Sequence, residues 1–304
     1  MSEKDANSLL YDKSINDERI ILKKQSIWSE AWRRYKKSKT AMFGLIVLSF
    51  IILAIIIGTI LIDETLVTQQ NSSDRFHPSS LNYWFGADGF GRDIFARIVY
   101  GGRASLAIGF GSSFLALITG GTLGLLVGYY GGRFDNIVMR LVDIIISIPP
   151  ILLSLAIVSA LGATMTNLII AITISRIPSF VRVIRSGVMG VTDNEYIEAA
   201  HSGGTSDFRI IFRHILPNVM SVVIVETTMS MSQLLLQAAT LSFLGLGIQP
   251  PSPEWGAMLS EAREFMRIHP MLMVYPGIAI VFSTLSLSLI GDGLRDAFDP
   301  RLRT

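Results

Sequence analysis

The chain has 304 residues, of which 50% are hydrophobic and only 16% are charged, and its mean hydropathy is +0.49. This composition is too apolar for a soluble protein of this length, so the sequence predicts an all-α integral membrane protein. No cysteine is present, which excludes disulfides and thiolate metal sites, and the four histidines lack ligand spacing, so no metal site is predicted.

The N-terminal residues 1–40 form a basic tail that contains all seven lysines. An uncharged run of 22 residues follows at 41–62, long enough to cross a hydrocarbon core of about 30 Å. We interpret this run as a transmembrane anchor, because it is too long for a signal peptide and no small-residue cleavage site follows it. The lysines place the tail in the cytoplasm and indicate orientation, so no nucleic-acid partner is expected.

The remaining apolar runs predict five further spans, at 104–130, 141–162, 166–181, 219–247 and 271–291. Prolines at Pro149-Pro150, Pro178 and Pro276 are expected to break or kink the helices that contain them. Six spans give an N-in, C-in topology with an external loop at 63–103, a core at 104–294 and a cytoplasmic tail at 295–304. The external loop carries five acids against four arginines, which agrees with this orientation. Two overlapping G-x-x-x-G steps in the second predicted span favour close packing against a neighbouring helix, at Gly120, Gly124 and Gly128.

Residues 192–217 form a polar segment between two predicted spans. Thr192 and Glu195 have the spacing of a capping box, and Gly203 with Gly204 supplies a break. A second helix is expected to begin at Thr205 and to end at Pro217. Its apolar stripe is expected to pack back on the membrane part and comprises Phe208, Ile211, Phe212 and Ile215. Periodicity alone fits a surface hairpin that joins two spans equally well.

Four polar residues lie on one face of the fifth predicted span at i, i+4, i+7 and i+11, namely Glu226, Ser230, Gln233 and Gln237. Polar groups in a membrane face a partner or a water-filled path, so the stripe fits a transport pathway or a set of interhelical hydrogen bonds. Arg176 is either a counter-ion for Glu226 or extends its side chain to the interface. Arg140 and Asp143 are expected to form a local i, i+3 pair.

Catalytic motifs are missing. There is no G-x-x-x-x-G-K-[ST] sequence and no nucleophile with a base at membrane depth, so the chain is not expected to be an enzyme or to hydrolyse ATP alone. A secondary transporter or channel with Glu226 as a proton or cation site explains the polar stripe, but it leaves the segment 192–217 unexplained.

Glu198-Ala199-Ala200, followed by Gly204 and by Leu216-Pro217, resembles the "EAA" loop of ABC importer permeases. The His-Ile-Leu-Pro-Asn sequence that ends this segment looks like the peptide and nickel branch. Residues 85–106, 241–259 and 291–302 are similar to the C-type permease of dipeptide and oligopeptide importers. The sequence departs from the family pattern at Ser288, and in having an arginine at position 176.

The resemblance implies that these six residues, from Glu198 to Pro217, seat in a groove of an ATPase subunit. It further implies a second, B-type permease, two ATPase subunits that carry ATP and Mg, and an extracytoplasmic substrate-binding protein, in a prokaryotic cytoplasmic (inner or plasma) membrane. The substrate stays open between dipeptides, oligopeptides, glutathione and nickel or metallophore complexes, because the external binding protein makes most of the selection.

Overall fold

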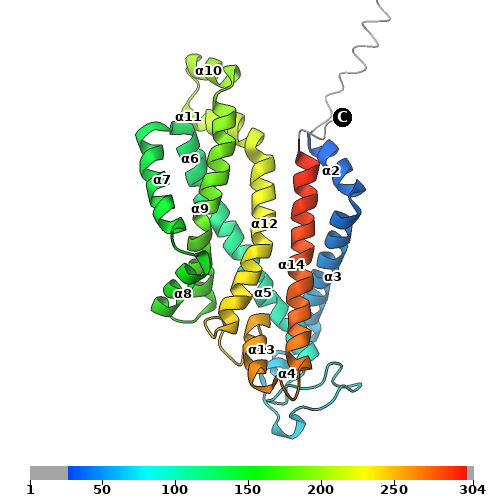
Figure 1. Ribbon diagram of the computed structural model, residues 1–304. Helices are drawn as coiled ribbons and strands as arrows, with labels where there is room; N and C mark the ends of the chain where they lie inside the picture. The colour runs from blue at the N-terminus through cyan, green and yellow to red at the C-terminus, as the bar shows by residue number, and fades with distance from the viewer. Residues whose placement is uncertain (1–26, 300–304) are drawn as a thin grey trace, which may run out of the picture.

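The computed structural model describes residues 27–299, and this part of the chain is a bundle of helices with no β-strand. One end of the bundle carries α2 (Ile27–Lys37), α10 (Glu195–Ser202) and the last turn of α14 (Met271–Phe298), and the opposite end carries α4 (Glu64–Thr68) and α13 (Trp255–Ala262) (Figure 1). Both ends of the described chain therefore lie on one side of the bundle. Most of the predicted tail 1–40 and part of the tail 295–304 fall outside the described residues.

Helix α3 (Lys39–Leu61) confirms the first predicted span. Ser38 starts it, because its hydroxyl accepts a hydrogen bond from the N–H of Ala41 at 3.3 Å. The helix packs along α14, which in turn packs along α12 (Leu216–Phe243) (Figure 1). Helix α12 also contacts α5 (Ile94–Ala116) and α9 (Met165–Thr192), so it lies in the middle of the bundle.

The second span begins at Ile94, ten residues earlier than the sequence predicts. Asp93 caps it by accepting a hydrogen bond from the N–H of Ala96 at 3.2 Å. Helix α5 continues through a wide turn at Leu117–Gly121 into α6 (Thr122–Tyr130), which gives 37 helical residues in all.

The glycine steps of the second span do pack against a neighbour, which is α9. A Cβ atom on Gly124 would lie 2.9 Å from the carbonyl oxygen of Val181, and one on Gly128 would lie 2.7 Å from the Cβ of Val188. Only glycine permits so close an approach of two helix backbones. The predicted role of these glycines in helix packing is therefore confirmed.

The third predicted span, 141–162, corresponds to a bent pair of helices and begins nine residues earlier than predicted. The structure has α7 (Gly132–Ile146) and α8 (Pro150–Leu161), which meet at an angle of 84°. Pro149 and Pro150 lie at the break, and a proline has no N–H to continue a helix. Within the described residues, five helices are long and apolar enough to cross a membrane, or six if this bent pair counts as one span.

The fourth span also differs from the prediction. Helix α9 extends to Thr192, eleven residues beyond the predicted end, and it contains both Arg176 and Pro178. The chain then passes through α10, a short helical turn α11 (Asp207–Arg209) and a wide turn at Ile210–Ile215 into α12. After α13 and a 3₁₀ turn at Arg263–Phe265, α14 closes the bundle against α3.

Candidate transport pathway and coupling surface

Helix α10 presents one polar and one apolar side. Glu198 and Ala199 are exposed and Ala200 is half-buried, whereas Ile197 is only 5% exposed and packs into the core between α9 and α12. The helix begins after Asn194, so the predicted capping box at Thr192 is wrong: that residue is in the last turn of α9, where its hydroxyl bonds the carbonyl of Met189 at 3.1 Å.

Gly204 ends the α10 turn in a left-handed conformation, with φ of +75°. The next N–H, of Thr205, bonds the carbonyl of Ala200 at 3.1 Å, which closes the helix end. A Cβ atom on Gly204 would have no neighbour within 4 Å. Glycine is therefore required here for its backbone conformation, and the predicted break is confirmed.

The second part of the segment is not a separate helix. Residues Asp207–Phe243 form one continuous helix of 37 residues, and Pro217 lies in the first turn of α12, so it does not end a helix as predicted. The wide turn explains this, because the N–H of Leu216 bonds the carbonyl of Ile211, five residues back. A proline without an N–H is tolerated where the helical bonding pattern shifts in this way.

The apolar stripe of this segment has two different surroundings. Ile211 and Ile215 are buried at 4% and 0% exposure against the core, as expected. Phe208 and Phe212 remain 71% and 49% exposed and contact each other with ring centroids 4.4 Å apart. The expectation that the whole stripe packs inward is therefore wrong for the two aromatic residues.

Two side-chain hydrogen bonds attach the segment to the membrane part. The hydroxyl of Tyr129, at the end of α6, donates to Asp207 at 2.8 Å. The amide of Asn218, in α12, donates to the hydroxyl of Tyr196, in α10, at 3.3 Å. Sequence reasoning missed these contacts, because their partners are far apart along the chain.

An ion pair lies inside the membrane part between α9 and α12. Arg176 Nη2 is 3.2 Å from Glu226 Oε1, and the Arg176 Nε and Nη2 donors are 3.0 and 2.9 Å from the hydroxyl oxygen of Ser230. The hydroxyl of Ser179 donates to the same Glu226 oxygen at 3.0 Å. Arg176 is thus a counter-ion for Glu226, and the charge of each is compensated inside the chain.

The two glutamines of the polar stripe behave differently. The side-chain amide of Gln237 donates to the hydroxyls of Ser154 in α8 and Ser175 in α9, at 2.9 and 3.2 Å. Gln233 is exposed, on the same face of α12. The stripe therefore contains interhelical bonds at Ser230 and Gln237 and an open polar position at Gln233.

Helix α7 is held to α9 by two further ion pairs. Arg185 contacts both carboxylate oxygens of Asp135, at 2.6 and 2.5 Å, and Arg182 contacts Asp143 at 2.6 Å. The expected local pair of Asp143 with Arg140 is therefore wrong. The sequence places Arg182 and Arg185 in a loop after the fourth predicted span. In the structure they belong to α9 and hold α7 against it.

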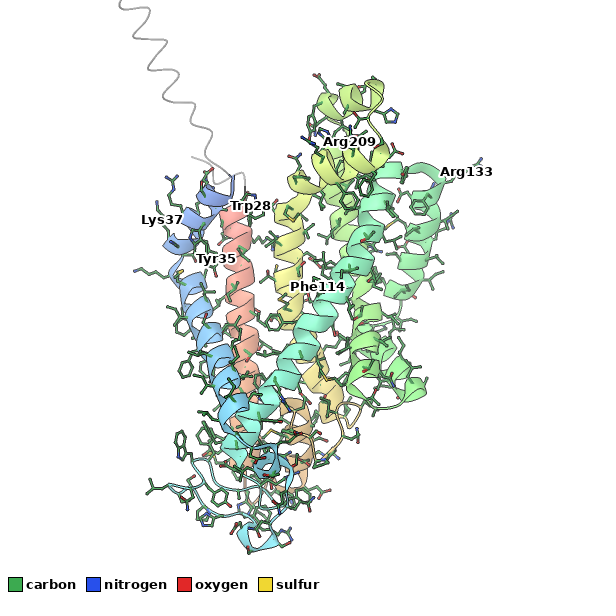
Figure 2. The ribbon with its side chains drawn as sticks, turned by 180° about the vertical axis from the view of Figure 1, so that it is seen from behind. Trp28, Tyr35, Lys37, Phe114, Arg133 and Arg209 are labelled. Atoms are coloured by element: carbon green, nitrogen blue, oxygen red, sulfur yellow. The ribbon has the colours of Figure 1, made fainter. Side chains whose placement is uncertain are left out.

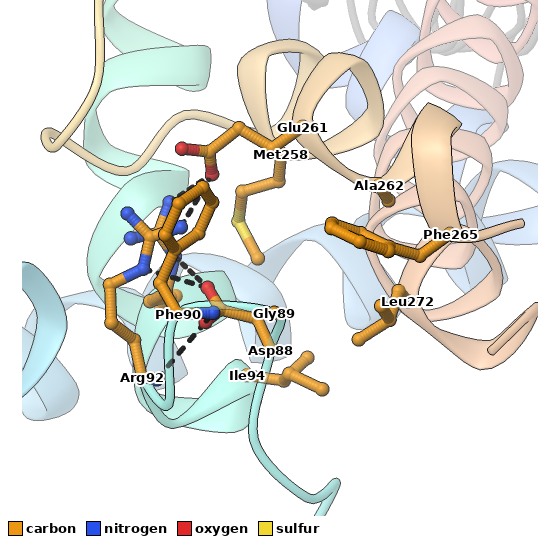
Figure 3. Close-up of a pocket in the computed structure, with 11 residues that line it drawn as sticks. Asp88, Gly89, Phe90, Arg92, Ile94, Met258, Glu261, Ala262, Phe265 and Leu272 are labelled. Atoms are coloured by element: carbon orange, nitrogen blue, oxygen red, sulfur yellow. Dashed lines mark hydrogen bonds and ion pairs between the residues drawn. The ribbon is translucent and has the colours of Figure 1, made fainter. Parts of the chain in front are cut away.

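At the opposite end of the bundle, two buried arginines join segments that are distant in sequence. Arg92 donates to Asp88 at 2.7 Å and to Glu261 at 2.9 Å (Figure 3). Arg97 donates to Glu261 at 2.8 Å. Both arginines are at most 2% exposed. Arg97 also bonds two backbone carbonyls, those of Val67 and Pro251.

A second set of buried contacts strengthens the same connection. Glu254 is 1% exposed; it caps α13 through the N–H groups of Gly256 and Ala257, and it accepts a hydrogen bond from Ser105 at 2.9 Å. Trp255 donates its ring N–H to the carbonyl of Ile98 at 2.8 Å. Nearby, burial raises the pKa of Asp93, against the lowering effect of the N–H groups that it caps. The segments 85–106 and 241–259, far apart in sequence, are thus held together by buried polar contacts.

Comparison with known proteins identifies the family. The family described as binding-protein-dependent transport system inner membrane component matches residues 120–304. The chain belongs to this family of ABC importer permeases. A second family, the N-terminal TM domain of oligopeptide transport permease C, matches residues 26–78 of the permease.

Characterised relatives match the permease over most of its length. It is 46% identical to the dipeptide transport system permease protein DppC of Alkalihalophilus pseudofirmus, over 92% of this chain and 91% of the relative. It is 44% identical to the glutathione transport system permease protein GsiD of Pectobacterium atrosepticum, over 91% of this chain and 92% of the relative.

Solved structures with a similar fold include inward-facing conformations of the MetNI methionine ABC transporter. One such chain superimposes with a TM-score of 0.55 at 20% identity and covers 67% of this permease and 97% of that chain. At this identity the likeness concerns the fold alone. It agrees with an all-α ABC importer permease that crosses the membrane several times.

Proposed function

We propose that this permease is one of two transmembrane subunits of an ATP-driven importer, with the exposed side of α10 as its contact with an ATPase subunit. The partners are a B-type permease, two ATPase subunits that bind ATP and Mg, and an external substrate-binding protein, in the cytoplasmic membrane of a prokaryote. Glu198, Ala199, Ala200 and Gly204 form the contact, while Leu216 and Pro217, the first two residues of α12, connect it to the membrane part.

The continuity of the helix Asp207–Phe243 carries this proposal. The helix starts beside α10, and no loop separates it from the polar face that contains Glu226 and Gln233. Buried Ile211 and Ile215 hold the first turns of this helix against α9. Movement of α10 by an ATPase subunit therefore passes through the short turn at Gly204 and the buried contact of Ile197 to a helix that continues unbroken into the membrane part.

The proposed cargo is a small peptide, a dipeptide or a glutathione-like tripeptide, because the relatives with 46% and 44% identity are named for dipeptide and glutathione transport. The polar face of α12 forms this subunit's half of the translocation path, with Gln233 as its open position. The competing class, a transporter that uses Glu226 as a proton or cation site, is disfavoured because Arg176 already compensates that carboxylate at 3.2 Å.

The contact is tested with the reconstituted complex by measuring ATP hydrolysis and peptide uptake together. Glu198→Lys reverses an exposed charge, and Gly204→Trp adds bulk at an open position, so either variant should still insert but lose uptake relative to ATP hydrolysis. Gly132→Trp is a matched control, because Gly132 also has a positive φ, of +59°, and open space around it.

Normal uptake per hydrolysed ATP in both Glu198→Lys and Gly204→Trp would refute the contact. Gly204→Ala separates the two effects at that position, because it introduces the unfavourable positive φ without the bulk. If Gly204→Ala uncouples as strongly as Gly204→Trp, backbone strain explains the result and surface contact at Gly204 does not.

A further inference from the structure

The N-terminal helix α2 and the first residue of α3 carry a basic face, which we define as Arg33, Lys36, Lys37 and Lys39. All four residues are exposed. None of them forms an ion pair within residues 27–299, whereas the neighbouring Arg34 is paired with Glu30. The ammonium group of Lys36 lies over the ring of Trp32, 5.0 Å from its centroid.

Two tryptophans lie between this basic face and the buried side of α2. Ala31 and Tyr35 are buried against the rest of the bundle, at 6% and 3% exposure. Trp28 and Trp32 are half-exposed, with their orientations fixed by Phe298 and Tyr35 respectively. A helix with a tryptophan strip beside a basic face is typical of the boundary between hydrocarbon and water.

The position of α2 places these groups at that boundary. Lys39 is the first residue of α3, whose outer side chains are apolar and exposed, among them Phe43 at 51% and Phe50 at 72%. Lys37 lies on the outer flank of the bundle, close to where α3 begins (Figure 2). The hydrocarbon region that surrounds α3 thus begins within a turn of the basic face.

We propose that the basic face of α2 and α3 binds anionic phospholipid headgroups. Four cations make up this face, and Asp296 of α14, which forms no ion pair within residues 27–299, lines a hollow together with Arg33 and Lys37. The surplus of positive charge attracts anionic lipid, and each basic residue near the surface raises the binding constant by about fivefold. The tryptophan strip favours lipid over an acidic protein surface as the occupant.

The test uses tryptophan fluorescence of the full-length chain in lipid vesicles. The chain has four tryptophans; Trp84→Phe removes the exposed one at the other end of the bundle, and Trp255, at 1% exposure, gives a constant background. Brominated phosphatidylglycerol should quench Trp28 and Trp32 with at least about fivefold higher relative affinity than brominated phosphatidylcholine.

Replacing the four residues of the basic face by glutamine should bring this preference close to one. Arg263→Gln with Arg267→Gln is the matched control, because both residues are exposed cations outside the basic face, and it should retain the preference. Raising the salt to about 0.5 M should weaken the preference of the unsubstituted face, a readout that does not depend on folding of a variant.

Equal quenching by the two lipids in the parent chain would overturn the proposal. A preference that survives in the glutamine variant, or that disappears equally in the control, would also overturn it. Lack of quenching by either lipid would show that the tryptophans do not face the membrane, and would likewise reject a lipid as the occupant.

Discussion

The ion pair between Arg176 of α9 and Glu226 of α12 gives a sharp prediction for stability. The charged atoms are 3.2 Å apart, and the two side chains retain 20% and 14% of their exposure. Glu226→Gln preserves the shape of the side chain but leaves the guanidinium of Arg176 without its carboxylate partner. An uncompensated charge inside a membrane protein is costly, so the variant should be less stable.

The magnitude follows from the partial exposure of the pair. Removing one partner of a fully buried pair costs about 3–5 kcal/mol. Because Arg176 and Glu226 are partly exposed, and because Ser230 remains as an acceptor 2.9 Å away, we expect a loss of about 1–3 kcal/mol in the free energy of unfolding. Arg176→Gln should act in the same direction.

The assay is equilibrium unfolding of the purified full-length chain in mixed micelles, followed by helical circular dichroism. The double variant should lose at least about 1 kcal/mol less than the sum of the two single variants. Arg182→Gln is the control, because Arg182 and its partner Asp143 are 46% and 58% exposed, and it should cost less than about 1 kcal/mol. Additive single effects would refute the reasoning.

Two further predictions concern the polar stripe and the topology. Gln237→Leu should lower the unfolding free energy by about 0.6–1.7 kcal/mol through lost interhelical bonds. Gln233→Leu should leave stability unchanged and reduce uptake per folded complex. A loss of stability in Gln233→Leu with a loss of uptake only in Gln237→Leu would reject the open path at Gln233. A single cysteine at Arg133 should be shielded from an impermeant thiol reagent in intact cells, whereas one at Glu264 should be labelled. Both positions are exposed on the protein, and the lysine distribution puts Arg133 on the cytoplasmic side. Labelling at Arg133 with protection at Glu264 would show that the predicted topology is inverted.

The sequence predicted those features that depend on neighbouring residues. The first span, the break at Pro149-Pro150 and the left-handed turn at Gly204 each follow from local backbone chemistry. The approach of α6 to α9 at Gly124 follows from a spacing of four residues. Each of these features needs no knowledge of distant contacts, and each is present in the structure.

The predicted helix ends were wrong where arginines are buried by distant partners. Hydropathy treats Arg97 as a residue outside the membrane part, but in the structure Glu261 and two backbone carbonyls bind its guanidinium, and the helix begins before it. The predicted end of α9 was wrong for a related reason, because Arg182 and Arg185, although not buried, are paired with acids of α7. The cost of a charge depends on its partner, which a single sequence does not reveal.

The structure also relates the coupling surface to the candidate path more directly than the sequence does. A separate capped helix ending at Pro217 would have let the residues between Gly204 and Pro217 move without α12. The continuous helix Asp207–Phe243 removes that freedom, and its core side is held to α9 by Ile211 and Ile215. Under the proposed function, α9 and α12 must therefore move together, with the ion pair of Arg176 and Glu226 preserved between them.

Under the proposed function, this constraint locates the surfaces that must slide during transport. Helices α3 and α14 pack in a different apolar cluster from the one that holds α10. The contact of α14 with α12 includes the hydroxyl pair of Ser232 and Ser288, 2.7 Å apart, and the approach of Gly291 to Met229. Small side chains at such a seam allow one helix to shift against another without large rearrangement. Under the proposed function, the seam between α12 and α14 is therefore where a movement that starts at α10 would change the width of the candidate path.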